Sequence, residues 1–208
     1  MINTIIVEDN TYIQNHFANM LSADERFNVL GCYRDALDGE TACLRERADL
    51  VLMDVQTLHN HSGLASARRI REQCPRTKVI VVTSLIDPDI LAEARRGGAD
   101  SLWYKDHCDS DIMEVIELTL AGKNIFPDTS PAVEINEMLS TDISPRQIEI
   151  LRRFVCGMTY DEIAADLKLT KRGVRWNLDQ IVEKGGFANK HELIAAVIES
   201  KLIVTTLK

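Results

Sequence analysis

The sequence has 208 residues, of which 45% are hydrophobic and 27% charged, the composition of a globular chain with one large or two small domains. Charges interrupt every hydrophobic run, which excludes a membrane span, and the opening MINTIIVEDN lacks the features of a signal peptide. The net charge of −8 excludes a uniformly basic protein, and five scattered cysteines without a C-x-x-C pair predict reduced thiols in a cytoplasmic protein rather than disulfides or a zinc site.

The charge is unevenly distributed along the chain. Residues 1–121 contain 12 basic and 20 acidic residues, whereas residues 142–208 contain 11 basic and 9 acidic residues. An acidic first half and a mildly basic second half predict two modules with different partners.

Residues 1–121 alternate between short apolar runs and amphipathic segments. We expect strands at 4–7, 27–32, 50–53, 78–83 and 101–104, and helices at 13–21, 36–47, 64–73, 88–96 and 110–121. Nearly continuous apolar strands separated by helices predict an α/β fold, with a five-stranded parallel, doubly wound sheet and helices on both faces. Ligands bind such sheets at the carboxyl ends of the strands.

Residues 122–142 are predicted to be an interdomain linker because Pro127 and Pro131 interrupt any regular pattern, although 133–139 could form a short helix. Residues 143–208 contain only helical patterns, which predicts an all-α domain of four helices. Ser144 and Pro145 begin the first, with Gln147 completing a capping box, and the others are expected at 159–167, 171–184 and 190–200.

Three carboxylates are expected at one edge of the predicted sheet. Glu8 and Asp9 follow the first strand, and Asp54 follows the third. Carboxylates this close together repel unless a cation lies among them, and a site with few oxygen ligands suits Mg²⁺. Asp54 is also a nucleophile that can accept a phosphoryl group. Thr83 and Lys105, after the fourth and fifth strands, could bind its oxygens.

On these five residues, the segment 1–121 resembles the receiver domain of two-component response regulators, whose strands follow the flavodoxin-like order. The resemblance implies that a sensor histidine kinase phosphorylates Asp54. It also implies Mg²⁺ held by Asp9, Asp54 and the backbone carbonyl of Gln56, with Glu8 acting mainly through water.

The segment that follows the acceptor departs from the family pattern. Leu58 stands where proline is usual and Gly63 comes one residue late, so we expect a more flexible and more polar loop. His59 and His61 could suggest a metal site or pH sensor, but a solvated loop is the expectation. Leu102 replaces the usual aromatic residue three before the lysine, which puts the usual coupling between that ring and the threonine in doubt.

Residues 144–203 resemble the LuxR-type helix-turn-helix of NarL/FixJ-class response regulators. The similarity is carried by ISPRQIEILRRFVCGMTYDEIAADL and LTKRGVRWNLDQIVEKGGFANKHELI. It implies double-stranded promoter DNA as a partner, with the segment 171–184 in the major groove. The residues expected at the DNA are Lys171, Arg172, Arg175, Trp176, Asn177, Asp179, Gln180 and Lys184.

Two features of this half leave alternatives open. Trp176 lies opposite the apolar face of its helix and could contact DNA, the receiver or a second protomer. The last helix is apolar on more than one face, so either residues 202–204 fold back over it or it forms a dimer seam. The resemblance favours a homodimer seam made by Leu193, Ile194, Val197 and Ile198.

The sequence therefore predicts a transcriptional response regulator in which phosphorylation of Asp54 controls dimerisation and promoter binding, with RNA polymerase as a further possible contact. One alternative is an atypical regulator that binds DNA without phosphorylation. Another is a Mg²⁺-dependent phosphatase with an Asp nucleophile, but such enzymes need a second Asp where this chain has Gln56.

Overall fold

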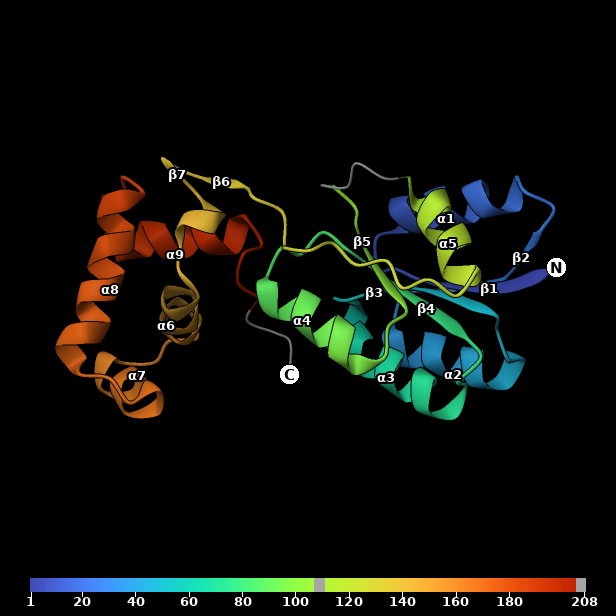
Figure 1. The fold of residues 1–208 in the computed structure, drawn as a ribbon, viewed down its shortest axis with the longest axis horizontal. Coiled ribbons are helices and arrows are strands. Elements are labelled where there is room, and N and C mark those ends of the chain that lie inside the picture. Colours follow the sequence, from blue (N-terminus) through green and yellow to red (C-terminus); the bar gives the residue numbers. More distant parts are fainter. Residues whose placement is uncertain (107–110, 205–208) are drawn as a thin grey trace. The chain divides into compact units, whose positions relative to one another are not determined.

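The computed structural model describes residues 1–106 and 111–204. The chain divides between Thr129 and Ser130 into two compact units (Figure 1). None of the helices in the described ranges is both long and apolar enough to cross a membrane.

The first unit is built on a parallel sheet of five strands in the order β2-β1-β3-β4-β5. The strands are β1 (Ile2–Val7), β2 (Phe27–Tyr33), β3 (Leu50–Asp54), β4 (Lys78–Thr83) and β5 (Ser101–Tyr104). This is the predicted α/β fold with the flavodoxin-like strand order, so that prediction is confirmed. Because all the strands run in the same direction, β1, β3, β4 and β5 end at the same edge of the sheet.

Helices cover both faces of this sheet (Figure 1). On one face, α1 (Thr11–Ser22) and α5 (Ile112–Leu120) pack on a core that includes Phe17, Leu52 and Ile116. On the other face, α2 (Ala36–Glu46) and α3 (Gly63–Gln73) pack on a core that includes Met53 and Ile70. The fifth helix of the unit, α4 (Pro88–Gly97), packs beside α3 and β5. Successive residues of each strand point to opposite faces, which explains why the strands are apolar throughout.

The predicted linker at 122–142 is divided between the two units. Ile125 is joined to β5 by two hydrogen bonds, from the Leu102 N–H to its carbonyl (2.9 Å) and from its own N–H to Ser101 Oγ (3.0 Å). The Phe126 ring lies 5.4 Å from the guanidinium of Arg95. Residues 122–129 are therefore part of the first unit.

The second unit begins with a small hairpin, β6 (Glu134–Ile135) and β7 (Met138–Leu139), followed by a 3-10 turn, η2 (Ser140–Asp142). The short helix considered for 133–139 is not formed, and the prediction of a separate linker was wrong for these residues. The backbone turns at Asn136, which has a φ of 55°. Its side chain donates to the carbonyl of Gly185 (2.7 Å) and so fastens the hairpin to the helical part of the unit.

Four helices complete the second unit: α6 (Pro145–Val155), α7 (Tyr160–Leu167), α8 (Lys171–Lys184) and α9 (Lys190–Glu199). The predicted capping box between Ser144 and Gln147 is present at the start of α6. A second box, between Thr159 and Glu162, starts α7. Such caps satisfy amide groups that have no partner within the helix, and each contributes about 1 kcal/mol.

Candidate functional site

The carboxylates of Glu8, Asp9 and Asp54 meet at the carboxyl edge of the sheet. One oxygen from each lies within 4.8 Å of the others. They come together because β1, which ends just before Glu8, is the neighbour of β3, whose last residue is Asp54. Glu8 and Asp54 are buried, and Asp9 is half-buried. The structure therefore assembles the acidic cluster expected from the sequence.

Lys105 adds a positive charge to this cluster. Its Nζ lies 2.5 Å from Glu8 Oε2 and 3.2 Å from Asp54 Oδ2, and the lysine side chain is itself almost completely buried. The backbone N–H of Lys105 donates to the carbonyl of Thr83 (2.9 Å), which continues the pairing of β5 with β4 beyond the last strand residue. The ammonium group is thus held in contact with two acids of the cluster.

The environment changes the acidity of these groups. Burial raises the pKa of Asp54 to about 7; the nearby Lys105 opposes this increase, and the negative charge of Glu8 adds to it. Burial by itself would lower the pKa of Lys105, but the charges of Asp54 and Glu8 outweigh burial and raise it. One cation is thus insufficient to compensate three crowded carboxylates. A second, divalent cation among them would favour the ionised form of Asp54.

Glu8 is fixed by contacts of its side chain and of the backbone around it. Its Oε1 accepts the N–H of Asn10 (3.1 Å), and its Oε2 faces Lys105. The backbone around it is fixed as well, because the Gln14 side chain donates to the Glu8 carbonyl (2.9 Å) and to the Tyr33 carbonyl (3.0 Å). Both oxygens of Glu8 are thus in contact with donors, as are those of Asp54, whose Oδ1 accepts the N–H of Val55 (2.8 Å) and whose Oδ2 faces Lys105.

Thr83 lies at the end of β4 and is completely buried. Its hydroxyl accepts the N–H of Leu85 (3.1 Å), so the structure does not place it in contact with Asp54. Leu102, which replaces an aromatic residue, is buried beside Val81. The neighbouring ring of Trp103 packs edge-on against Phe17, 6.4 Å between centroids, on the α1 and α5 face of the sheet.

The loop after Asp54 contains local structure that the sequence analysis did not predict. It contains a 3-10 turn, η1 (Leu58–Asn60), in which His59 and Asn60 have positive φ values of 60° and 59°. These two residues accommodate the extra length of the loop in a left-handed turn. Gly63 begins α3 so close to the acceptor that a Cβ atom there would lie 1.8 Å from the carbonyl oxygen of Asp54.

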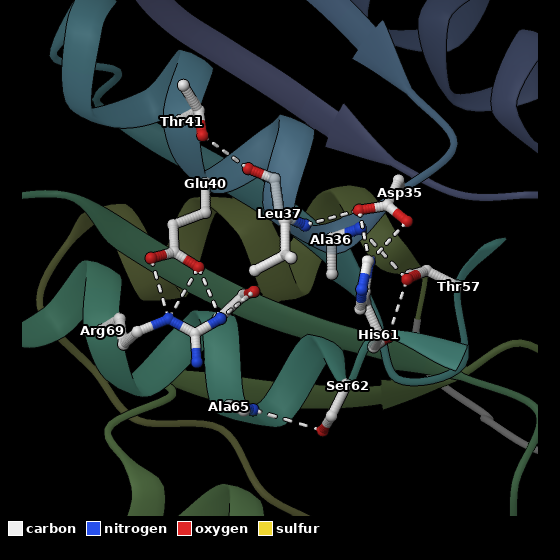
Figure 2. A network of polar contacts seen from close by, with 11 residues as sticks. Asp35, Ala36, Leu37, Glu40, Thr41, Thr57, His61, Ser62, Ala65 and Arg69 are labelled. Atoms are coloured by element: carbon white, nitrogen blue, oxygen red, sulfur yellow. Dashed lines mark hydrogen bonds and ion pairs between the residues drawn. The ribbon is translucent and has the colours of Figure 1, made fainter. Parts of the chain in front are cut away.

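A network of polar contacts joins this loop to the start of α2 (Figure 2). His61 Nδ1 lies 2.7 Å and 2.9 Å from the two carboxylate oxygens of Asp35. Thr57, which is buried, accepts the Ala36 N–H (3.0 Å) and donates to the His61 carbonyl (2.7 Å). His61 is therefore not simply solvated: its side chain is 41% exposed, but its Nδ1 contacts Asp35. Sequence reasoning missed Asp35 and Thr57; for Asp35, its place just before the predicted helix marks it as an N-cap.

The residues of α8 that are expected to bind DNA differ in their exposure and in the contacts that their side chains already make. The apolar face of the helix is buried at Val174, Leu178 and Ile181. On the opposite face, Trp176 is 59% exposed, and Arg172 is exposed, with no hydrogen bond or ion pair from its side chain to any residue that the structure describes. Lys171 is exposed and forms an ion pair with Asp161 of α7 (2.6 Å).

Several of the other residues expected to contact DNA instead form hydrogen bonds or ion pairs within the second unit. Asp179 forms ion pairs with Lys190 of α9 and, at 3.5 Å, with Arg175. Asn177 donates to the Gly173 carbonyl of its own helix (2.8 Å). The last two expected residues are also engaged: Gln180 donates to Glu183 (3.3 Å), and Lys184 lies 3.1 Å from Asp142. The carboxylate of Asp179 is therefore already compensated within the unit.

The dimer seam predicted on α9 is only partly exposed. Leu193 and Val197 are completely buried, so their assignment to a seam was wrong. Ile198 is exposed and Ile194 half-buried. Leu202 and Ile203, the residues considered as a cover for this helix, are buried.

Comparison with protein families gives two matches. Residues 4–117 match the family described as response regulator receiver domain. Residues 141–197 match the family described as bacterial regulatory proteins, luxR family. The two matches fall on the two units of the structure, and the first covers more than half of the chain.

Similar proteins cover almost the entire chain. One is the uncharacterized transcriptional regulatory protein YvfU of Bacillus subtilis (29% identity; 97% of this chain and 98% of the relative). Another is the oxygen regulatory protein NreC of Staphylococcus aureus (24% identity; 96% and 98%). Among solved structures, RcsB of Salmonella enterica bound to promoter P1flhDC with phosphomimetic BeF3− is similar in fold (TM-score 0.63, 21% identity; 97% of this chain and 98% of that chain).

Proposed function

Because the chain belongs to the response regulators, with a receiver domain followed by a LuxR-type DNA-binding domain, we propose that phosphorylation of Asp54 controls its binding to promoter DNA. It is a DNA-binding transcriptional regulator by family. The observation that carries the proposal is the cluster of Glu8, Asp9, Asp54 and Lys105 at one edge of the sheet.

The residues present fit Mg²⁺. Asp9 and Asp54 would hold the ion directly, together with the backbone carbonyl of Gln56, and Glu8 would act through water. The donor set consists of oxygen atoms only, and the buried Asp54 favours a nearby divalent charge, as its raised pKa indicates. When bound, Mg²⁺ would neutralise charge on the transferred phosphoryl group.

The protein side of the transfer can be assigned to three residues. An oxygen of Asp54 attacks the phosphorus of a phosphohistidine on a sensor kinase, and the P–N bond breaks with its electron pair left on the histidine nitrogen. The ammonium of Lys105, now 3.2 Å from Asp54, stabilises the phosphoryl oxygens. Thr83 would have to exchange its hydrogen bond with Leu85 for one with the phosphoryl group.

For the second unit, we propose that α8 enters the major groove of promoter DNA. The support is its exposed face, on which Arg172 and Trp176 have the fewest competing contacts. Arg175 can also reach DNA, since its 3.5 Å pair with Asp179 is a weak, exposed one. A homodimer would use the exposed side of α9 at Ile198, with Ile194 beside it.

The test is incubation of the full chain with phosphoramidate and Mg²⁺, followed by intact mass spectrometry and DNA-binding titration. We expect wild type to gain one phosphoryl group, and Asp54→Asn to gain none. Asp49→Asn is the matched control, because Asp49 is an exposed acid that comes directly before the first residue of the same strand. Phosphorylation should strengthen binding of wild type to a DNA site selected from a random library.

Two results would change this proposal. Absence of incorporation into wild type would contradict the phosphoacceptor assignment. Incorporation at Asp54 without any change in DNA affinity or oligomeric state would favour the atypical regulator, in which DNA binding is independent of phosphorylation. The buried Leu102 in place of a mobile ring is the observation that keeps this second candidate open.

A further inference from the structure

We propose that Asp35 and His61 form a clamp that positions the loop 55–62 for Mg²⁺ binding. This inference rests on the proposed function in one respect, namely that Gln56 in this loop supplies a carbonyl ligand. The clamp replaces the proline that such loops usually contain at the position of Leu58. His61 and Asp35 are thus positioning residues rather than ligands.

The loop is closed on itself on both sides of Gln56. Before it, the carbonyl of Val55 accepts the N–H of Gly63 (2.9 Å). After it, the hydroxyl of Thr57 donates to the carbonyl of His61 (2.7 Å). Gln56 itself is bridged to Ser62 across the loop. The conformation at Gln56 therefore depends on where residues 61–63 are held.

His61 contacts Asp35, whose position is also fixed by its role as a helix cap. Asp35 is the N-cap of α2, and its Oδ1 accepts the N–H of Leu37 (2.9 Å). The same carboxylate faces His61 Nδ1 with both oxygens and is buried, with its side chain only 7% exposed. Burial alone would raise the pKa of Asp35, but its hydrogen bonds to His61 and to the α2 backbone together outweigh burial and lower this pKa. The ring of His61 thus meets a fixed carboxylate (Figure 2).

The segment 34–36 contacts both parts of the chain that are proposed to hold Mg²⁺. On the side of the loop, the Arg34 carbonyl accepts the N–H of Leu58 (3.0 Å), and the Ala36 N–H donates to Thr57 (3.0 Å). On the other side, Arg34 Nε donates to the backbone carbonyl of Asp9 (3.1 Å). One rigid segment at the start of α2 thus sets the positions of the Asp9 and Gln56 regions relative to each other. Such preorganisation strengthens metal binding because less ordering is required when the ion binds.

The test is a calorimetric Mg²⁺ titration of the full, metal-free chain, combined with hydrogen exchange of the 55–63 amides. His61→Ala should raise the Kd for Mg²⁺ by roughly 10-fold, the lower end of the range for removal of a residue that orients metal ligands. The same variant should exchange faster at 55–63. His61→Asn should restore most of the affinity, because its amide nitrogen can occupy the place of Nδ1.

Arg69→Met is the matched control. The Arg69 ion pair with Glu40 also joins α3 to α2, with N–O distances of 2.7–2.9 Å, but it does not include the 55–62 loop (Figure 2). Side-chain exposures are alike, 37% and 10% for this pair against 41% and 7% for His61 and Asp35. We expect Arg69→Met to leave the Mg²⁺ affinity unchanged.

An unchanged Kd in His61→Ala would overturn the clamp, as would an equal loss of affinity in Arg69→Met. If His61→Ala does not fold, Asp35→Asn replaces it: this variant keeps an oxygen for capping α2 but loses the charge, and it should bind Mg²⁺ more weakly than wild type. Because the titration needs no phosphoryl transfer, failure of Asp54 phosphorylation with the expected pattern of Kd values would reject only the proposed function.

Discussion

Replacing Asp54 by Asn should stabilise the receiver, and the gain should depend on pH. In the metal-free protein, burial raises the pKa of this carboxyl from 3.8 to about 7. The folded state therefore binds a proton more tightly than the unfolded state. Wild type loses stability as the pH rises from the unfolded pKa through the folded one, and the loss levels off above about pH 8. Because the Asn side chain does not titrate, Asp54→Asn should not lose stability in this way as the pH rises.

The magnitude follows from the size of the shift. About three pKa units at about 1.4 kcal/mol each give a total of about 4 kcal/mol above pH 8. Part of this loss of stability is already present at pH 5. The difference in the free energy of unfolding between Asp54→Asn and wild type should therefore increase by about 2–3 kcal/mol from pH 5 to pH 8. Mg²⁺ binds the ionised carboxylate and so stabilises folded wild type. At a Mg²⁺ concentration of 100 times the Kd, this should reduce the difference in the free energy of unfolding by about 2.7 kcal/mol.

Urea unfolding followed by tryptophan fluorescence measures this difference. The chain has two tryptophans, so in a Trp176→Phe background Trp103 alone reports on the receiver, where it packs against Phe17. Titrations in chelator at several pH values give the free energy of unfolding for both variants. Parallel pH profiles for Asp54→Asn and its parent would refute the idea that a buried, uncompensated charge at this position destabilises the protein.

Two further substitutions test the geometry of the two sites. Gly63→Ala should destabilise the receiver by about 3 kcal/mol or more in urea unfolding, because its Cβ would lie 1.8 Å from the Asp54 carbonyl oxygen and α3 would have to move; a loss below about 0.5 kcal/mol would contradict this. Trp176→Ala should change the stability of the second unit little, since the side chain is 59% exposed, but should weaken binding to a selected DNA site about 10-fold in fluorescence anisotropy. If Trp176→Ala bound DNA as tightly as wild type, the Trp176 ring would not contact DNA, and a role in contacts with protein would be favoured.

The regular elements could be predicted because their signals are local. The bounds of β4, β5 and α8 coincide with those expected from the sequence. Each of these segments is a continuous run with one periodicity and a clear break at both ends. The carboxyl edge could be predicted for a related reason, since the alternation of strands and helices places Glu8, Asp54 and Lys105 at strand ends.

The parts that could not be predicted depend on contacts between distant residues. His61 and Asp35 are 26 positions apart, and nothing near His61 distinguishes a bound ring from a solvated one. The hairpin at 134–139 has strands of two residues, too short for a periodic signal. Leu193 and Val197 belong to a helix with apolar residues on more than one face, and a sequence alone cannot tell the face that packs inside from the face that stays outside.

The fate of Asp179 shows how such contacts alter the prediction of a binding surface. On the sequence it lies on the outward face of α8, where an acid would repel phosphates. In the structure, Lys190 of α9 and Arg175 both compensate its charge. Lys190 also lies 6.0 Å from the ring centroid of Tyr160, so the pair ties α8 and α9 to α7. We therefore expect the acid to stabilise the position of α8 rather than to contact the groove, which leaves Arg172, Trp176 and the weakly paired Arg175 as the residues proposed to contact DNA.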